Sequence, residues 1–167
     1  KMGKKTIFNL IGPLSSPAQV KRQVVGVFDK KWMRPFAEAL RENDVEHAYI
    51  VHSEDGMDEI SPFAKTNIVE LKDKKIFEFT VDPKKIGINL NNINNLKGKN
   101  AKYNSTKILE IFKGKFDEFA TAVSLNVAAG LIVSEVENDF NDAFNKAKNQ
   151  LASGNVYHHL KKLQIRQ

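Results

Sequence analysis

The stretch QVVGVFDKKWMRPFAEALRENDVEHAYIVHS, residues 23–53, determines the fold class. The run QVVGVF at its start, within the segment 19–28, is short, β-branched and bounded by polar residues, which is typical of a buried strand. HAYIVHS, residues 47–53, predicts the next strand. The segment between them has helical periodicity, and a strand–helix–strand succession makes a βαβ unit. The two strands are therefore expected to be parallel, with a right-handed crossover.

The connecting helix has its own start signals. Asp29 is a suitable N-cap, and Trp32, Phe36 and Leu40 belong to the apolar stripe that follows it. Pro35 leaves two alternatives: it lies in the first turn of a helix that begins near Trp32, or it kinks that helix.

Beyond the βαβ unit, the pattern changes twice. NIVELKDKKIFEFTV, residues 67–81, alternates polar and apolar residues on both sides of KDKK, which predicts a β-hairpin. A polar loop is expected after it, and from Thr106 the periodicity is helical, with Gly154 as a C-terminal stop. The fold class is α/β: a central sheet with parallel strands flanked by helices, plus a β-hairpin.

Composition narrows the classes of protein. The chain has 167 residues, no cysteine and a formal net charge of +6, and its lysines are spread along the chain among acids without interleaved aromatic residues. A solvated surface is therefore favoured over a nucleic-acid footprint. No apolar run approaches the roughly 18 residues of a membrane span, and the absence of cysteine fits a reducing cytoplasm. The chain begins at Lys1 and not at Met, so we expect it to be a piece of a longer protein.

An acidic turn follows the second predicted strand. HSEDGMDEIS, residues 52–61, places four carboxylates around Gly56, of which Asp58 and Glu59 are adjacent. Ligands of open α/β sheets bind beyond the carboxyl ends of strands, and neighbouring carboxylates suit magnesium, which keeps several waters and takes substrate phosphates. From this stretch alone, a solvated loop whose acids cap a following helix is the better interpretation.

Several blocks in one order carry a family resemblance. They include GKKTIFNLIGPLSSPA (residues 3–18), VHSEDGMDEIS (51–61), AVSLNVAAGLIV (122–133) and AKNQLASGNVYHHLKKL (147–163). The series resembles the C-terminal part of the anthranilate phosphoribosyltransferases of tryptophan biosynthesis, over essentially the whole chain. The resemblance implies that residues 1–167 are the C-terminal part of a larger α/β phosphoribosyltransferase domain, without its N-terminal helical domain and phosphate loop.

The resemblance also implies an activity. The family transfers phosphoribosyl from phosphoribosyl pyrophosphate to anthranilate and releases pyrophosphate, with Mg²⁺ as cofactor. Asp58 and Glu59 match the metal-binding pair, which reverses the preference for a solvated loop. Lys5 stands where the family has an arginine that contacts the carboxylate of anthranilate, and a lysine keeps the charge without the planar grip. No residue of this chain is expected to act as a catalytic acid or base.

Further expectations follow from the resemblance. The family's glycine-rich phosphate loop does not occur in this sequence, so we expect the chain alone to have no transferase activity. The full-length protein is expected to be a cytoplasmic homodimer that binds neither nucleic acid nor membrane. Two other interpretations stay open: a pyrimidine nucleoside phosphorylase-like enzyme, and a non-catalytic relative that binds a ligand or nucleic acid.

Overall fold

The computed structural model describes residues 12–15 and 17–164. The chain forms two compact units. Unit 1 is formed within residues 1–60 and 64–82, and unit 2 within residues 61–63 and 83–167. Each unit has its own core, and the candidate site lies in unit 1.

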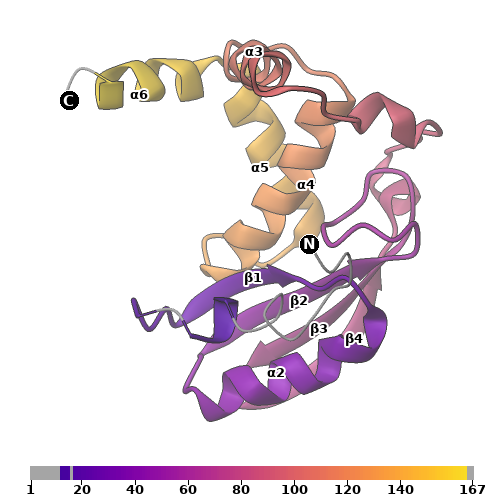
Figure 1. The fold of residues 1–167 in the computed structure, drawn as a ribbon, viewed down its shortest axis with the longest axis vertical. Helices are drawn as coiled ribbons and strands as arrows, with labels where there is room; N and C mark the ends of the chain where they lie inside the picture. Colours follow the sequence, from indigo (N-terminus) through magenta and orange to yellow (C-terminus); the bar gives the residue numbers. More distant parts are fainter. Residues whose placement is uncertain (1–11, 16, 165–167) are drawn as a thin grey trace. The chain divides into compact units, whose positions relative to one another are not determined.

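Unit 1 is built on a four-stranded sheet in the order β1-β2-β3-β4 (Figure 1). The strands are β1 (Arg22–Gly26), β2 (His47–Ser53), β3 (Thr66–Lys72) and β4 (Lys75–Val81). β1 and β2 are parallel, whereas β3 is antiparallel to both β2 and β4. The predicted α/β class, parallel strand pair and hairpin are confirmed.

Helix α2 (Met33–Glu42) covers one face of this sheet (Figure 1). The Asp29 carboxylate accepts a hydrogen bond from the Lys31 backbone N–H at 3.1 Å and begins a 3₁₀ turn, η1 (Lys30–Trp32), that leads into the helix. Pro35 is the third residue of α2, so the first of the two alternatives for this proline is correct. The core of unit 1 lies between α2 and the sheet, where Leu40 is 1% exposed.

The β3–β4 hairpin turns at two residues with positive φ. Asp73 has φ 50° and Lys74 has φ 64°, and they join strands that pair from Lys72↔Lys75 to Thr66↔Val81. Positive φ at both central residues is the backbone of a two-residue turn that matches the twist of its strands. β3 therefore runs away from the edge of the sheet at which β2 ends, and β4 returns to it.

Unit 2 is helical. Its elements are η2 (Pro83–Ile86), η3 (Ile93–Leu96), α3 (Ala101–Phe112), α4 (Glu118–Val133), α5 (Phe140–Ala152) and α6 (Asn155–Gln164). α3 begins five residues before the predicted start at Thr106, because the Asn100 side chain accepts a hydrogen bond from the Tyr103 N–H at 2.9 Å and caps the helix. Gly154, with φ 72°, ends α5 as predicted, although α6 begins immediately after it.

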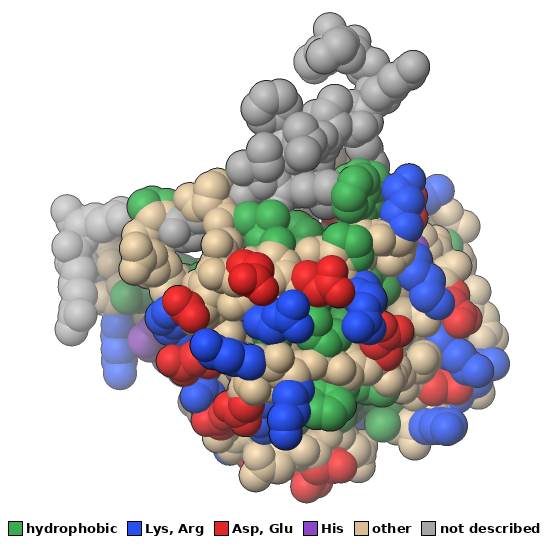
Figure 2. Space-filling model, turned by 90° about the horizontal axis from the view of Figure 1, so that it is seen from below, with side chains coloured by type: hydrophobic (Ala, Val, Ile, Leu, Met, Phe, Trp, Pro, Cys, Tyr) green, Lys and Arg blue, Asp and Glu red, His purple; other side chains and the backbone are tan. Residues whose placement is uncertain are grey.

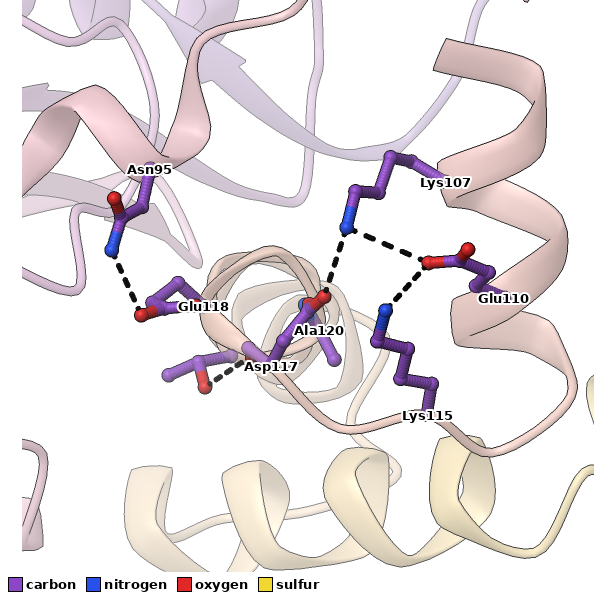
Figure 3. Close-up of polar contacts among 8 residues, drawn as sticks. Asn95, Lys107, Glu110, Lys115, Asp117, Glu118 and Ala120 are labelled. Atoms are coloured by element: carbon purple, nitrogen blue, oxygen red, sulfur yellow. Dashed lines mark hydrogen bonds and ion pairs between the residues drawn. The ribbon is translucent and has the colours of Figure 1, made fainter. Parts of the chain in front are cut away.

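Polar contacts connect the elements around the start of α4 (Figure 3). The Asp117 carboxylate accepts a hydrogen bond from the Ala120 N–H at 3.2 Å, and the Lys107 ammonium lies 3.6 Å from the same side chain. Lys115 donates a hydrogen bond to Glu110 at 2.8 Å. This hydrogen bond is the main cause that holds the pKa of Glu110 below its usual value.

Helix α4 is apolar on all sides. Its inner residues pack on α5, with Leu125 fully buried, while Val123 and Val127 are 37% and 43% exposed. A helix of this kind is usually covered all round. Among the described residues, no helix is long and apolar enough to cross a membrane.

Candidate metal site at one edge of the sheet

The acidic turn lies at the edge of the sheet that the sequence predicts. β1 ends at Gly26, which pairs with Val51 of the parallel strand β2, so the carboxyl ends of both strands meet at one edge. β2 ends at Ser53, and the turn begins at the next residue, Glu54. This is the edge at which open α/β sheets bind ligands.

Backbone and side-chain hydrogen bonds close the turn. The Ser53 N–H donates to the Met57 carbonyl at 2.9 Å, and the Gly56 N–H donates to the Ser53 carbonyl at 3.0 Å. Gly56 has φ 90°, a conformation that favours glycine. The Asp55 carboxylate accepts from the Met57 N–H at 3.2 Å, so this acid stabilises the turn itself.

Asp58 and Glu59 have a different environment. Both side chains are exposed, and neither carboxylate has a hydrogen bond or ion pair with any residue that the structure describes. The chain continues through buried Ile60 into β3 without forming a helix, which removes the interpretation that these acids cap a following helix. Two adjacent carboxylates therefore point into solvent at the carboxyl edge.

The backbone of Asp58 lies directly on the end of β1. A Cβ atom built at Gly26 would be 1.7 Å from the Asp58 carbonyl oxygen and 2.7 Å from its carbonyl carbon. Only glycine leaves enough space for this approach, and the contact joins residues that are far apart in sequence. The acid pair is thus placed by contacts of its backbone and not by those of its side chains.

Other polar groups share this edge. The His52 Nδ1 lies 2.9 Å from the Val27 carbonyl oxygen, so Nδ1 carries the hydrogen that it donates to this oxygen. The Lys30 ammonium donates to the Asn67 side-chain oxygen at 2.9 Å. A hydrogen bond from the Lys31 side chain is the main cause that lowers the pKa of Asp29. These contacts connect the β1–α2 segment to the ends of β2 and β3.

The two carboxylates fit a magnesium ion whose remaining ligands come from water and a substrate. The described residues contain no group of three or more His, Asp or Glu side chains arranged to hold a metal ion. Mg²⁺ is commonly bound through one or two carboxylates, with waters and substrate phosphates completing its octahedron. Asp58 and Glu59 can supply those two carboxylates, and a closed cage of protein ligands is not required.

The predicted substrate-binding residue, Lys5, lies outside the described residues. The described part of the GPLSSP segment lies away from the acidic turn: Pro13 and Leu14 line a cavity of about 350 Å³ with Gln23 and Val45, near the amino ends of β1 and β2. The Asn43 side chain donates to the Leu14 carbonyl at 3.2 Å and fixes this arrangement. Residues 12–15 are therefore not part of the edge that carries Asp58.

Charged side chains on the face in Figure 2 are mixed in sign. Lys and Arg side chains alternate there with Asp and Glu. Ion pairs of this kind include Arg34 of α2, which lies 3.3 Å from Glu38 of the same helix and 3.0 Å from Glu78 of β4. The described side chains on this face thus neutralise one another and do not form a basic patch.

Comparison with known proteins identifies the class. The chain belongs to the glycosyl transferase family, a/b domain, whose family model matches residues 1–157. It is 57% identical over 98% of its length to an anthranilate phosphoribosyltransferase from Pelagibacter ubique (strain HTCC1062), and 42% identical over 93% of its length to one from Methanosarcina barkeri. These matches cover 50% and 42% of the two relatives, so the chain spans about half the length of the curated relatives it matches.

Solved structures agree with this relationship. The anthranilate phosphoribosyltransferase from Thermus thermophilus superposes with a TM-score of 0.84 at 30% identity, over 96% of this chain and 47% of its own. A variant of the Saccharomyces cerevisiae enzyme, solved with Mg bound, has a TM-score of 0.84 at 25% identity, over 95% of this chain and 47% of its own. The fold described above is therefore that of about half of such an enzyme.

Proposed function

We propose that this chain is the C-terminal part of an anthranilate phosphoribosyltransferase and that Asp58 and Glu59 help to bind its Mg²⁺. The observation that carries the proposal is the exposed acid pair at the carboxyl edge, in a chain 57% identical to a relative of that name. The Mg-bound yeast structure supports the choice of metal. On this proposal the full-length protein is a cytoplasmic homodimer that binds phosphoribosyl pyrophosphate and anthranilate.

The reaction forms one bond and breaks one. The nitrogen lone pair of anthranilate forms a bond to C1 of the ribose, the bond from C1 to the pyrophosphate oxygen breaks, and pyrophosphate leaves with the electron pair while the amine loses a proton. When bound, Mg²⁺ would offset the negative charge that develops on pyrophosphate. Asp58 and Glu59 would hold the Mg²⁺ ion at the carboxyl edge, and Lys5 would attract the carboxylate of anthranilate. No acid or base of this chain is assigned to the proton.

A chimaera tests the proposal. Residues 1–164 would replace the matching half of the Pelagibacter ubique relative, and anthranilate consumption would be followed by its fluorescence with Mg²⁺ and phosphoribosyl pyrophosphate. We expect turnover. Combining Asp58→Asn with Glu59→Gln should lower it by at least about 100-fold, because the loss of groups that only orient metal ligands already lowers activity by about 10- to 100-fold. Glu54→Gln, which alters another exposed acid of the same turn, is the matched control and should leave turnover unchanged.

Two results would contradict the proposal. A folded chimaera without turnover, beside an active parent, would exclude this chain as a functional half of the enzyme. Full activity in the Asp58→Asn, Glu59→Gln chimaera would exclude the acid pair as a metal site. The chain alone is expected to give no turnover in the same assay.

A further inference from the structure

A buried pair of hydroxyls lies directly behind the acidic turn. Ser53 is the last residue of β2 and faces Thr66, the first residue of β3, and both side chains are fully buried. The Ser53 Oγ donates a hydrogen bond to the Glu59 carbonyl at 2.7 Å and lies 2.5 Å from the Thr66 Oγ1. The Thr66 hydroxyl therefore shares a hydrogen bond with the hydroxyl that holds the Glu59 carbonyl, and the two side chains form one buried polar pair.

Ser53 holds the acid pair from both sides. Its backbone N–H donates to the Met57 carbonyl at 2.9 Å, and its hydroxyl donates to the Glu59 carbonyl at 2.7 Å. Asp58 lies between these two anchored residues. Since the carboxylates of Asp58 and Glu59 have no partner among the described residues, the anchored backbone sets the positions from which both side chains extend.

We infer that Ser53, backed by Thr66, is a positioning residue that orients Asp58 and Glu59 for a divalent ion. The inference rests on the proposed function, because it takes the acid pair as the metal site. Groups that orient metal ligands through hydrogen bonds commonly change metal affinity by 10- to 100-fold when they are removed. Here the hydroxyl acts on the backbone of the ligands, so an effect of about tenfold, at the low end of this range, is expected for Ser53→Ala.

The choice of ion separates positioning from a general loss of structure. Mg²⁺ requires nearly ideal octahedral geometry at short distances, whereas Ca²⁺ accepts longer distances and flexible geometry. A loosened acid pair should therefore lose more affinity for Mg²⁺ than for Ca²⁺. A variant that only destabilises the unit, and stays folded in the assay, should bind both ions as the parent does.

The experiment measures the ions alone on the 167-residue chain. Binding of Mn²⁺ would be measured from the EPR signal of the free ion, and Mg²⁺ and Ca²⁺ by competition against Mn²⁺. We expect Ser53→Ala to lower the affinity for Mg²⁺ about tenfold and the affinity for Ca²⁺ less than about threefold. Thr66→Val, which keeps the shape without the hydroxyl, should weaken Mg²⁺ about threefold, and Thr66→Ser should restore the affinity of the parent.

Ser124→Ala is the matched control. Ser124 is also fully buried, and its hydroxyl donates to the Ala120 carbonyl at 2.8 Å within α4, so its loss should leave the affinity for all three ions unchanged. Circular dichroism confirms that each variant is folded, and if Ser53→Ala does not fold, the comparison of Thr66→Val with Thr66→Ser decides the question.

The outcomes separate the two proposals. Unchanged Mn²⁺ binding in Asp58→Asn, Glu59→Gln would overturn the metal site itself. If that double variant loses Mn²⁺ while Ser53→Ala and Thr66→Val bind Mg²⁺ as the parent does, the site stands and the positioning role is wrong. Equal losses for Mg²⁺ and Ca²⁺ in Ser53→Ala would also overturn the positioning role.

Discussion

Replacing Gly26 with alanine tests whether the acidic turn rests on the end of β1. The added Cβ would be 1.7 Å from the Asp58 carbonyl oxygen, 2.7 Å from its carbonyl carbon and 3.2 Å from its Cβ. Real Cβ contacts essentially never fall below 3.0 Å, so the two segments must separate by more than an ångström. The obstructing atoms belong to backbone, which cannot rotate away as the end of a flexible side chain does.

Two opposing effects determine the size of the change. Overpacking at a well-packed contact costs about 1–3 kcal/mol. Alanine in place of glycine also restricts the unfolded chain, which stabilises the folded state by about 0.4–1 kcal/mol where the backbone permits it. The steric cost is larger, so we expect Gly26→Ala to lower the free energy of unfolding by about 1–2 kcal/mol.

Urea unfolding followed by tryptophan fluorescence measures this change. Trp32 is the single tryptophan of the chain and packs against the core of unit 1, so its emission reports the unit that contains Gly26. Gly130→Ala is the control: this glycine lies inside α4 with nothing within 4 Å of an added Cβ, and its replacement should raise helix stability by up to about 1 kcal/mol, seen by circular dichroism. An unchanged fluorescence midpoint in Gly26→Ala would show that Asp58 does not rest on β1.

Three further predictions concern unit 2, each measured by circular dichroism at 222 nm. Asp117→Ala should lower the free energy of unfolding by about 1 kcal/mol because α4 loses its N-cap, whereas Asp117→Asn should retain most of that free energy. Equal losses in the two variants would contradict the role of Asp117 as the cap. Because the pKa of Glu110 is lowered, its contribution is complete above the unfolded pKa of about 4.5 and disappears as the pH falls through the lower folded value. Below pH 4.5, the urea midpoint should therefore decrease less steeply with falling pH in Glu110→Gln than in the parent. An identical pH profile would exclude the Lys115 contact as a cause of the pH dependence. Leu125→Ala should cost about 2–5 kcal/mol because the side chain is fully buried, whereas Val127→Ala, at an exposed position, should stay within about 0.5 kcal/mol; similar losses at both positions would contradict the packing of α4.

The sheet of unit 1 could be predicted because its signals are local. β-branched runs, the Asp29 cap and the KDKK turn each specify an element within a few residues, and the structure contains the corresponding strands, helix and hairpin. The predicted start of α3 was wrong for a physical reason. α3 is exposed, with only Ile111 buried, so its first turn has no apolar stripe, and the cap at Asn100 was the signal that could have located it.

The candidate site was predictable only in part. The position of Asp58 and Glu59 after β2 follows from the rule that ligands bind at the carboxyl ends of strands. The contacts that hold them were missed, because Gly26 meets Asp58, and Ser53 meets Thr66, only after the sheet has formed. A glycine inside a strand is the one local signal for such an approach, since it commonly marks a place where another backbone comes close.

The division between a buried framework and exposed ligands has a consequence for the proposed enzyme. Desolvation of two adjacent carboxylates is unfavourable, and exposure of Asp58 and Glu59 avoids that cost before the ion arrives. With only two protein carboxylates, the remaining ligands of Mg²⁺ would be water and phosphate oxygens. The ion would then bind more tightly together with phosphoribosyl pyrophosphate than alone, and the rigid backbone supplied by Gly26 and Ser53 would determine which approach of the metal–diphosphate is productive.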